Sequence, residues 1–143
     1  MKIKKHIYDE IISTIGKPNP EKGGILGSVD RETITHFYYD VSGSSTEYSY
    51  TPDIVEVNKV LDDWAQNDVY FVGIVHSHNP DVKYPSCMDI EYAGNILEGL
   101  NYTDEFYLPI LIHEEESLVL PYKVTSEGKK NLRVSEETIQ IEE

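Results

Sequence analysis

The sequence predicts a single three-layer domain of the α/β or α+β class, and two observations carry this prediction. The 143 residues include 39% apolar side chains, which suits one hydrophobic core rather than two. Segments with helical periodicity alternate with short β-type runs, in the order helix, two or three strands, helix, strand, helix, two strands. We assign residues 1–126 to this domain and residues 127–143 to an acidic tail or a short helix.

Three segments place apolar residues at helical spacing. Residues 3–15 carry a stripe of isoleucines, and the run GKPNPEKGG, rich in proline and glycine, then ends the helix. Residues 53–66 form the second segment, with Thr51 or Asp53 as the residue that caps its start. Residues 86–100, SCMDIEYAGNILEGL, form the third.

The segments between them predict strands. GGILGSVD and ETITHFYYDVS can form a hairpin, and the polar run SGSSTEYSY is a loop or a weak edge strand. VYFVGIVHSH is almost wholly apolar until its end, as expected of a central strand covered on both faces. FYLPILIHE and LVLPYKVT are the last two strands, and each contains a proline that predicts an edge or a bulge at that point.

The composition argues against several classes of partner and location. A net charge of −14 would repel a phosphate backbone or an anionic lipid surface, so we expect no nucleic-acid or membrane partner. Cys87 is the one cysteine, so no internal disulfide can form. Asp9 and Glu10 interrupt the apolar start, which argues against a signal peptide, and no apolar run reaches membrane-spanning length. We therefore expect a cytoplasmic protein.

The stretch VHSHNPDVKYPSCMDIEYA, residues 75–93, has the pattern of a metal site. Side chains at positions i and i+2 of a strand lie on the same face, so His76 and His78 can converge on one ion. Catalytic zinc usually has three protein ligands and leaves a fourth position to water. Asp89, in the first turn of the following helix, is the natural third ligand.

Each part of this pattern also has an ordinary structural interpretation. Two histidines near a strand end are common as plain polar residues. Ser86 and Asp89 match the capping box S-x-x-D, whose side chains satisfy amides at a helix start. The complete spacing H-x-H-x7-S-x2-D is far rarer by chance than its parts, which favours the metal site, and Ser86 can be both a cap and a catalytic group.

A metal site of this kind needs a general base to take a proton from the bound water. Glu21 precedes GGILG, where two glycines would let the backbone pass close to another strand or a ligand. The alternative is a solvated carboxylate in a turn, and the residues by themselves favour that alternative.

Taken together, these motifs resemble the JAMM (MPN+) family of zinc metallopeptidases over residues 3–124. HSH, followed after seven residues by SCMD, and EKGGILG upstream match the family's signature in chain order. The sequence departs from the family's pattern at Asn79, where a proline is common, and at Lys22, where a small residue is common. Neither position removes a residue of the signature.

The resemblance implies a fold and a set of residue roles. The fold is a cytidine deaminase-like three-layer sandwich, in which a central mixed sheet is flanked by helices. The implied ligands of one zinc ion (Zn2+) per chain are His76, His78 and Asp89. Glu21 matches the glutamate that deprotonates the zinc-bound water, and Ser86 matches the serine that stabilises the oxyanion.

The resemblance also implies an activity. Compact bacterial members are associated with ubiquitin-like modifiers or sulfur-carrier proteins, so we expect hydrolysis of a peptide or isopeptide bond at the C-terminus of such a protein. An extended substrate tail could add as a strand beside the sheet, with Tyr48 and Tyr50 along the groove.

Three alternatives remain open. The first is a non-catalytic scaffold or binding module for a ubiquitin-like partner, although such members typically lack zinc ligands. The second is a zinc nucleoside deaminase, which needs H-x-E and P-C-x-x-C, and the single Cys87 cannot supply the latter. The third makes Cys87 a thiol nucleophile paired with His76 or His78.

Overall fold

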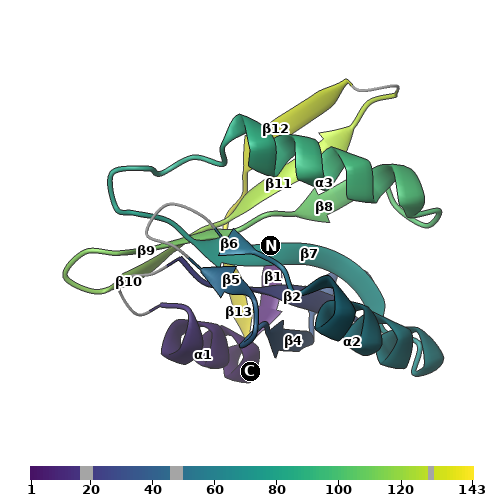
Figure 1. Ribbon diagram of the computed structural model, residues 1–143, viewed down its shortest axis with the longest axis horizontal. Coiled ribbons are helices and arrows are strands. Elements are labelled where there is room, and N and C mark those ends of the chain that lie inside the picture. Colours follow the sequence, from purple (N-terminus) through teal and green to yellow (C-terminus); the bar gives the residue numbers. More distant parts are fainter. Residues whose placement is uncertain (17–20, 46–49, 129–130) are drawn as a thin grey trace.

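The computed structural model describes residues 1–16, 21–45, 50–128 and 131–143. Within these residues a central mixed sheet carries three helices (Figure 1), none of them long and apolar enough to span a membrane. The elements in chain order are β1 (Lys2–Lys4), α1 (Lys5–Thr14), β2 (Gly23–Ser28), β3 (Thr33–Ile34), β4 (His36–Tyr39), β5 (Ser44–Ser45), β6 (Tyr50–Thr51), α2 (Ile54–Gln66), β7 (Tyr70–Ser77), α3 (Cys87–Gly99), β8 (Glu105–Tyr107), β9 (Ile110–His113), β10 (Ser117–Leu120), β11 (Tyr122–Ser126), β12 (Leu132–Glu136) and β13 (Gln140–Glu142).

β7 lies in the middle of the central sheet. On one edge it pairs antiparallel with β2, which places Gly23 opposite His76, and β4 extends the sheet beyond β2. On its other edge β7 runs parallel to β8 and then β9. The apolar run 70–77 is therefore the central strand that its composition predicts, and its carboxyl end carries His76, with His78 directly after its last residue.

Two segments that the sequence predicts as single strands are each divided in two. FYLPILIHE splits into β8 and β9 at Leu108 and Pro109, and LVLPYKVT splits into β10 and β11 at Pro121. Proline has no N–H to donate to a ladder, so the pairing changes partner at each break. β9 pairs antiparallel with β10, whereas β8 pairs antiparallel with β11, which in turn pairs with β12. Each proline thus ends one strand instead of sitting in an edge or a bulge.

The helices cover both faces of this sheet. Val75 packs in one core with the isoleucines of α1, whereas its neighbour Ile74 packs in a second core with α2 and α3. Trp64 of α2 and Ala93 of α3 are both buried in this second core. Figure 1 shows α3 lying across β8, β11 and β12. The arrangement confirms the predicted class, a three-layer sandwich with a mixed sheet at its centre.

The two ends of the chain differ from the prediction. The segment Lys2–Lys4 is a strand, so the first helix begins at Lys5 rather than at Ile3. The C-terminal residues form β12 and β13 instead of an acidic tail or a short helix. β13 pairs in parallel with β1, and the Met1 ammonium donates a hydrogen bond to the Thr138 carbonyl oxygen at 2.7 Å. Pairing between distant segments therefore decides the conformation of both ends.

Candidate metal centre

β7 carries two imidazoles to one side of its carboxyl end. The Nε2 atoms of His76 and His78 lie 2.8 Å apart. Both side chains are largely buried, with about 6% exposure each. Backbone hydrogen bonds fix this end of the strand, because the His78 N–H donates to the Leu111 carbonyl oxygen at 2.8 Å. The imidazoles converge, as their spacing on a strand predicts.

Asp89 meets the two histidines from the first turn of α3. Its Oδ2 atom lies 3.3 Å from the Nε2 atom of each imidazole. The same carboxylate closes a capping box: Oδ2 accepts a hydrogen bond from the Ser86 N–H at 2.8 Å, and the Ser86 Oγ accepts one from the Asp89 N–H at 3.0 Å. The capping interpretation and the ligand interpretation of SCMD are therefore compatible.

The three donor atoms have the spacing of a tetrahedral site. Zinc bonds to nitrogen and carboxylate oxygen are about 2.0–2.2 Å long, which puts neighbouring ligands of a tetrahedron roughly 3.3 Å apart. Two of the three donor separations are 3.3 Å, and the 2.8 Å between the imidazoles needs only a small opening. Two nitrogens and one carboxylate oxygen are a donor set that zinc accepts. His76, His78 and Asp89 therefore fit a zinc ion with one open position.

The electrostatics favour the protonation states that a cation needs at His76 and Asp89. At His78, burial lowers the pKa, but the hydrogen bonds to Asp89 and to the Val82 carbonyl oxygen outweigh it and raise the pKa, so a cation would have to displace a proton there. Burial lowers the pKa of His76, which keeps this imidazole neutral near pH 7. Burial alone would raise the pKa of Asp89, but its contacts with the His76 and His78 imidazoles outweigh it and hold the pKa well below the usual range. A neutral imidazole and an ionised carboxylate are the forms that bind metals.

The loop after β7 orients the second imidazole. His78 Nδ1 lies 3.0 Å from the Val82 carbonyl oxygen. A carbonyl can only accept, so Nδ1 carries the proton and the lone pair of the neutral ring is on Nε2, which faces the other two donors. Outer hydrogen bonds of this kind fix the tautomer and the direction of a metal-binding histidine.

Glu21 reaches the same site from the segment before β2. Its side chain is only 8% exposed, so the interpretation as a solvated turn carboxylate is wrong. Lys22 fastens the backbone beside β7, because its N–H donates to the Ser77 Oγ at 2.9 Å and its carbonyl oxygen accepts from the Ser77 N–H at 2.8 Å. Burial raises the pKa of the Glu21 carboxyl, opposed by the charge of His78. A raised pKa suits a carboxyl that exchanges protons near neutral pH.

All five predicted site residues line one cavity of about 390 Å³. Glu21, His76, His78, Ser86 and Asp89 lie at one end of it. The Ser86 hydroxyl oxygen is engaged as a cap acceptor, but its own proton is free to donate into the cavity. The structure thus brings together residues separated by up to 68 positions in the chain.

Tyr50 also lines the cavity, whereas Tyr48 lies outside the described residues. The Tyr50 hydroxyl donates to Asp40 Oδ2 at 2.7 Å, and the same oxygen accepts from the Asp53 N–H at 2.9 Å. Asp40 is buried, and it joins β6, whose Tyr50 lines the cavity, to the start of α2. No sequence motif indicates this role for Asp40, because the pairing depends on packing between separate segments.

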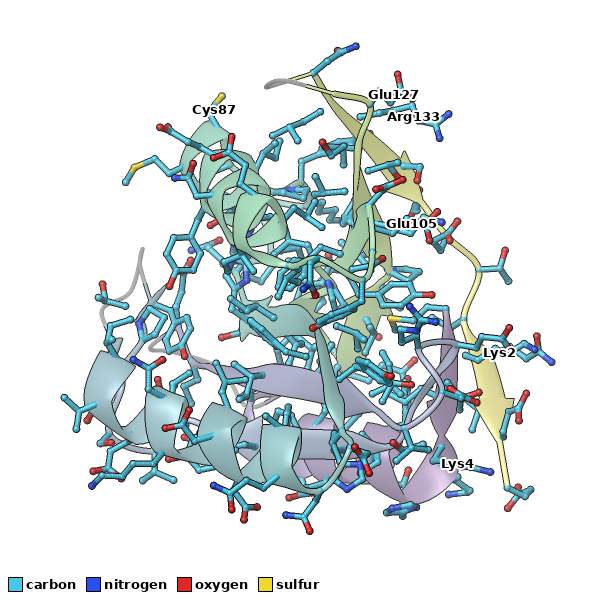
Figure 2. All side chains as sticks on the ribbon, turned by 90° about the vertical axis from the view of Figure 1, so that its right-hand side faces the viewer. Lys2, Lys4, Cys87, Glu105, Glu127 and Arg133 are labelled. Atoms are coloured by element: carbon cyan, nitrogen blue, oxygen red, sulfur yellow. The ribbon has the colours of Figure 1, made fainter. Side chains whose placement is uncertain are left out.

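Cys87 does not belong to the site. It is exposed at the first position of α3 and is not among the residues that line the cavity. Figure 2 shows its side chain at the outer end of the helix. A thiol in this position cannot approach the imidazoles as a nucleophile paired with a base, so the thiol mechanism finds no support in the geometry.

Comparisons with known proteins agree with the fold and the motif. The family model described as prokaryotic homologs of the JAB domain matches residues 6–119. The solution structure of protein DSY2949 from Desulfitobacterium hafniense is similar, with a TM-score of 0.67 and 19% sequence identity over 99% of this chain and 92% of that chain. At this identity the likeness concerns the fold alone. No curated protein matches the sequence.

Proposed function

Since the chain belongs to the family of prokaryotic homologs of the JAB domain, we propose that it is a zinc-dependent hydrolase of a peptide or isopeptide bond. The observation that carries the proposal is the set of three donor atoms at tetrahedral spacing with a buried glutamate in the same cavity. A scaffold would not need this set. Family membership and the donor set support a metallohydrolase, and the choice of bond is our proposal.

The roles of the residues follow from their positions in the cavity. His76, His78 and Asp89 would hold a zinc ion, which would supply a Lewis acid to polarise the substrate carbonyl and to lower the pKa of a water toward about 7. Glu21 takes the proton of that water and then returns it to the leaving amine. The Ser86 hydroxyl donates to the oxyanion, a contribution of about 3 kcal/mol for one such donor.

For the substrate we propose the C-terminal tail of a ubiquitin-like or sulfur-carrier protein. Strand β6 supports this choice, since Tyr50 and Thr51 line the cavity and a substrate tail can add as a strand beside the two-stranded β5–β6 sheet. The net charge of −14 favours a neutral or basic partner. We further propose that the protein acts in the cytoplasm.

Two measurements test the proposal together. Metal analysis of the purified protein should find one zinc ion per chain. Glu21→Gln should retain that zinc but lose hydrolysis of a cognate conjugate, because the amide cannot take the proton. A Glu21→Gln variant that cleaved the conjugate at the wild-type rate would show that another group is the base. Absence of stoichiometric zinc in the wild-type protein would favour the scaffold.

A further inference from the structure

The cavity extends beyond the predicted zinc site into an apolar pocket. Its charged residues, Glu21, His76, His78 and Asp89, gather at one end. The other end is formed by β7, α3 and the β8–β9 segment through Ile74, Ala93, Phe106 and Leu108, all of them buried members of the second core.

The positions of these residues place the pocket next to the reacting bond. Ile74 is two residues before His76 on the same face of β7, about 6.6 Å away at 3.3 Å per residue. Ala93 is four residues after Asp89, one turn further along the same side of α3. Both elements therefore lead from the donor atoms into the apolar end, so a ligand on the metal can extend directly between them.

The pocket suits an apolar group and not a charged one. A charged side chain would lose its hydration there, and the walls of this end offer no ionic partner. Ala93 contributes only a methyl group to this lining. Tyr92 and Met88 form the outer wall, and they are 42% and 80% exposed. The aromatic ring of Tyr92 and the flexible thioether of Met88 can both pack against an apolar ligand.

We propose that this end of the cavity is a specificity pocket that binds one large apolar side chain of the substrate, at the residue adjacent to the scissile bond. The proposal rests on the hydrolase function proposed above and adds a selection rule to it. Substrates with an aromatic or long aliphatic residue at that position should be preferred over those with a charged residue.

Binding of small zinc ligands to the zinc-loaded protein tests the pocket without any turnover. Acetohydroxamate occupies the metal alone, whereas 3-phenylpropanohydroxamate carries a ring that reaches the apolar end. Calorimetry should show the phenyl compound binding at least about tenfold more tightly. The burial of an aromatic ring contributes more binding free energy than a tenfold change in affinity requires. The matched chain that ends in a carboxylate, 3-carboxypropanohydroxamate, should show no gain.

Two substitutions in the pocket test whether the phenyl ring binds there. Ala93→Leu should fill the pocket and remove the gain, while acetohydroxamate binding stays unchanged. Tyr92→Ala should reduce the gain by removing a wall, and its exposed position makes it tolerable if Ala93→Leu fails to fold. Tyr70→Ala is the control, because it removes another part-exposed tyrosine, at the far end of β7, and should keep the full gain.

The outcomes separate the two proposals. Equal affinity of the acetyl and phenyl compounds would overturn the pocket and leave the zinc site intact. A gain that persists in both Ala93→Leu and Tyr92→Ala would overturn it as well, because the ring would bind elsewhere. Failure of acetohydroxamate to bind the zinc-loaded wild-type protein would instead contradict the open metal position on which the hydrolase function depends.

Discussion

Tyr122 offers a test of how the zinc site is positioned. Its hydroxyl donates to the Lys83 carbonyl oxygen at 2.7 Å, and the residue is only 4% exposed. Lys83 follows Val82, whose carbonyl oxygen accepts the Nδ1 proton of His78. Tyr84, in the same loop, also packs against the Tyr122 ring. β11 therefore holds the loop that orients one of the proposed zinc ligands, and Tyr122→Phe should loosen it.

The size of the effect follows from the bonds involved. Loss of one hydrogen bond costs about 1 kcal/mol of folding stability, and an unpaired carbonyl adds to that cost. Removal of a direct hydrogen-bond partner of a metal ligand lowers metal affinity by about 10- to 100-fold. Tyr122 acts one residue away from that partner, so we expect a loss of zinc affinity near the lower limit, about tenfold.

The assay is zinc affinity measured by competition with a chelator, with urea unfolding alongside. Tyr102→Phe is a matched control, because the Tyr102 hydroxyl donates to the Phe71 carbonyl oxygen at 2.6 Å, at the end of β7 away from the histidines. Both variants should lose similar stability, but Tyr122→Phe alone should lose zinc affinity. Equal zinc affinities in the two variants would refute the positioning role.

Two further predictions concern the metal and the wall beside it. A free zinc concentration of 100 times the dissociation constant should raise the free energy of unfolding of the wild-type protein by about 2.7 kcal/mol. Thermal unfolding with and without zinc detects this difference. Asp89→Ala should abolish that difference, and a full zinc effect in this variant would exclude Asp89 as a ligand. Gly23→Ala should cost about 1–3 kcal/mol, because the new methyl group would overlap the Tyr50 ring. Urea unfolding measures this cost, and an unchanged midpoint would mean that the ring moves freely.

Local patterns predicted the parts of the fold that local forces decide. The second helix needs only its apolar stripe and its cap, and Asp53 accepts the Glu56 N–H as an N-cap should. β7 could be recognised because a strand buried on both faces is apolar throughout. The ends of the chain could not, because β1 and β13 are strands through pairing with distant segments: β1 lies between β3 and β13, and Lys2 pairs with Gln140. A polar run such as SEETIQIEE does not indicate that it pairs with a strand at the other end of the chain.

The candidate site likewise combines features that the local sequence predicts with features that depend on packing between distant segments. The spacing of His76, His78 and Asp89 follows from a strand and a helix start, so the sequence predicts their convergence. The burial of Glu21 depends on how the segment before β2 packs against β7, through bonds between Lys22 and Ser77. The glycines of GGILG indicate a close approach of the backbone, but they do not indicate which neighbour is approached.

The capping box explains how a short loop can hold a metal ligand accurately. The Ser86 amide binds the Asp89 oxygen that faces both imidazoles, so the interaction that starts the helix also fixes the direction of that oxygen. The positive end of the α3 dipole further favours an ionised carboxylate at this position. Because one carboxylate satisfies the helix start and the cation together, its match to a local capping rule is no argument against a ligand. Here the local rule contributes the preorganisation that the site requires.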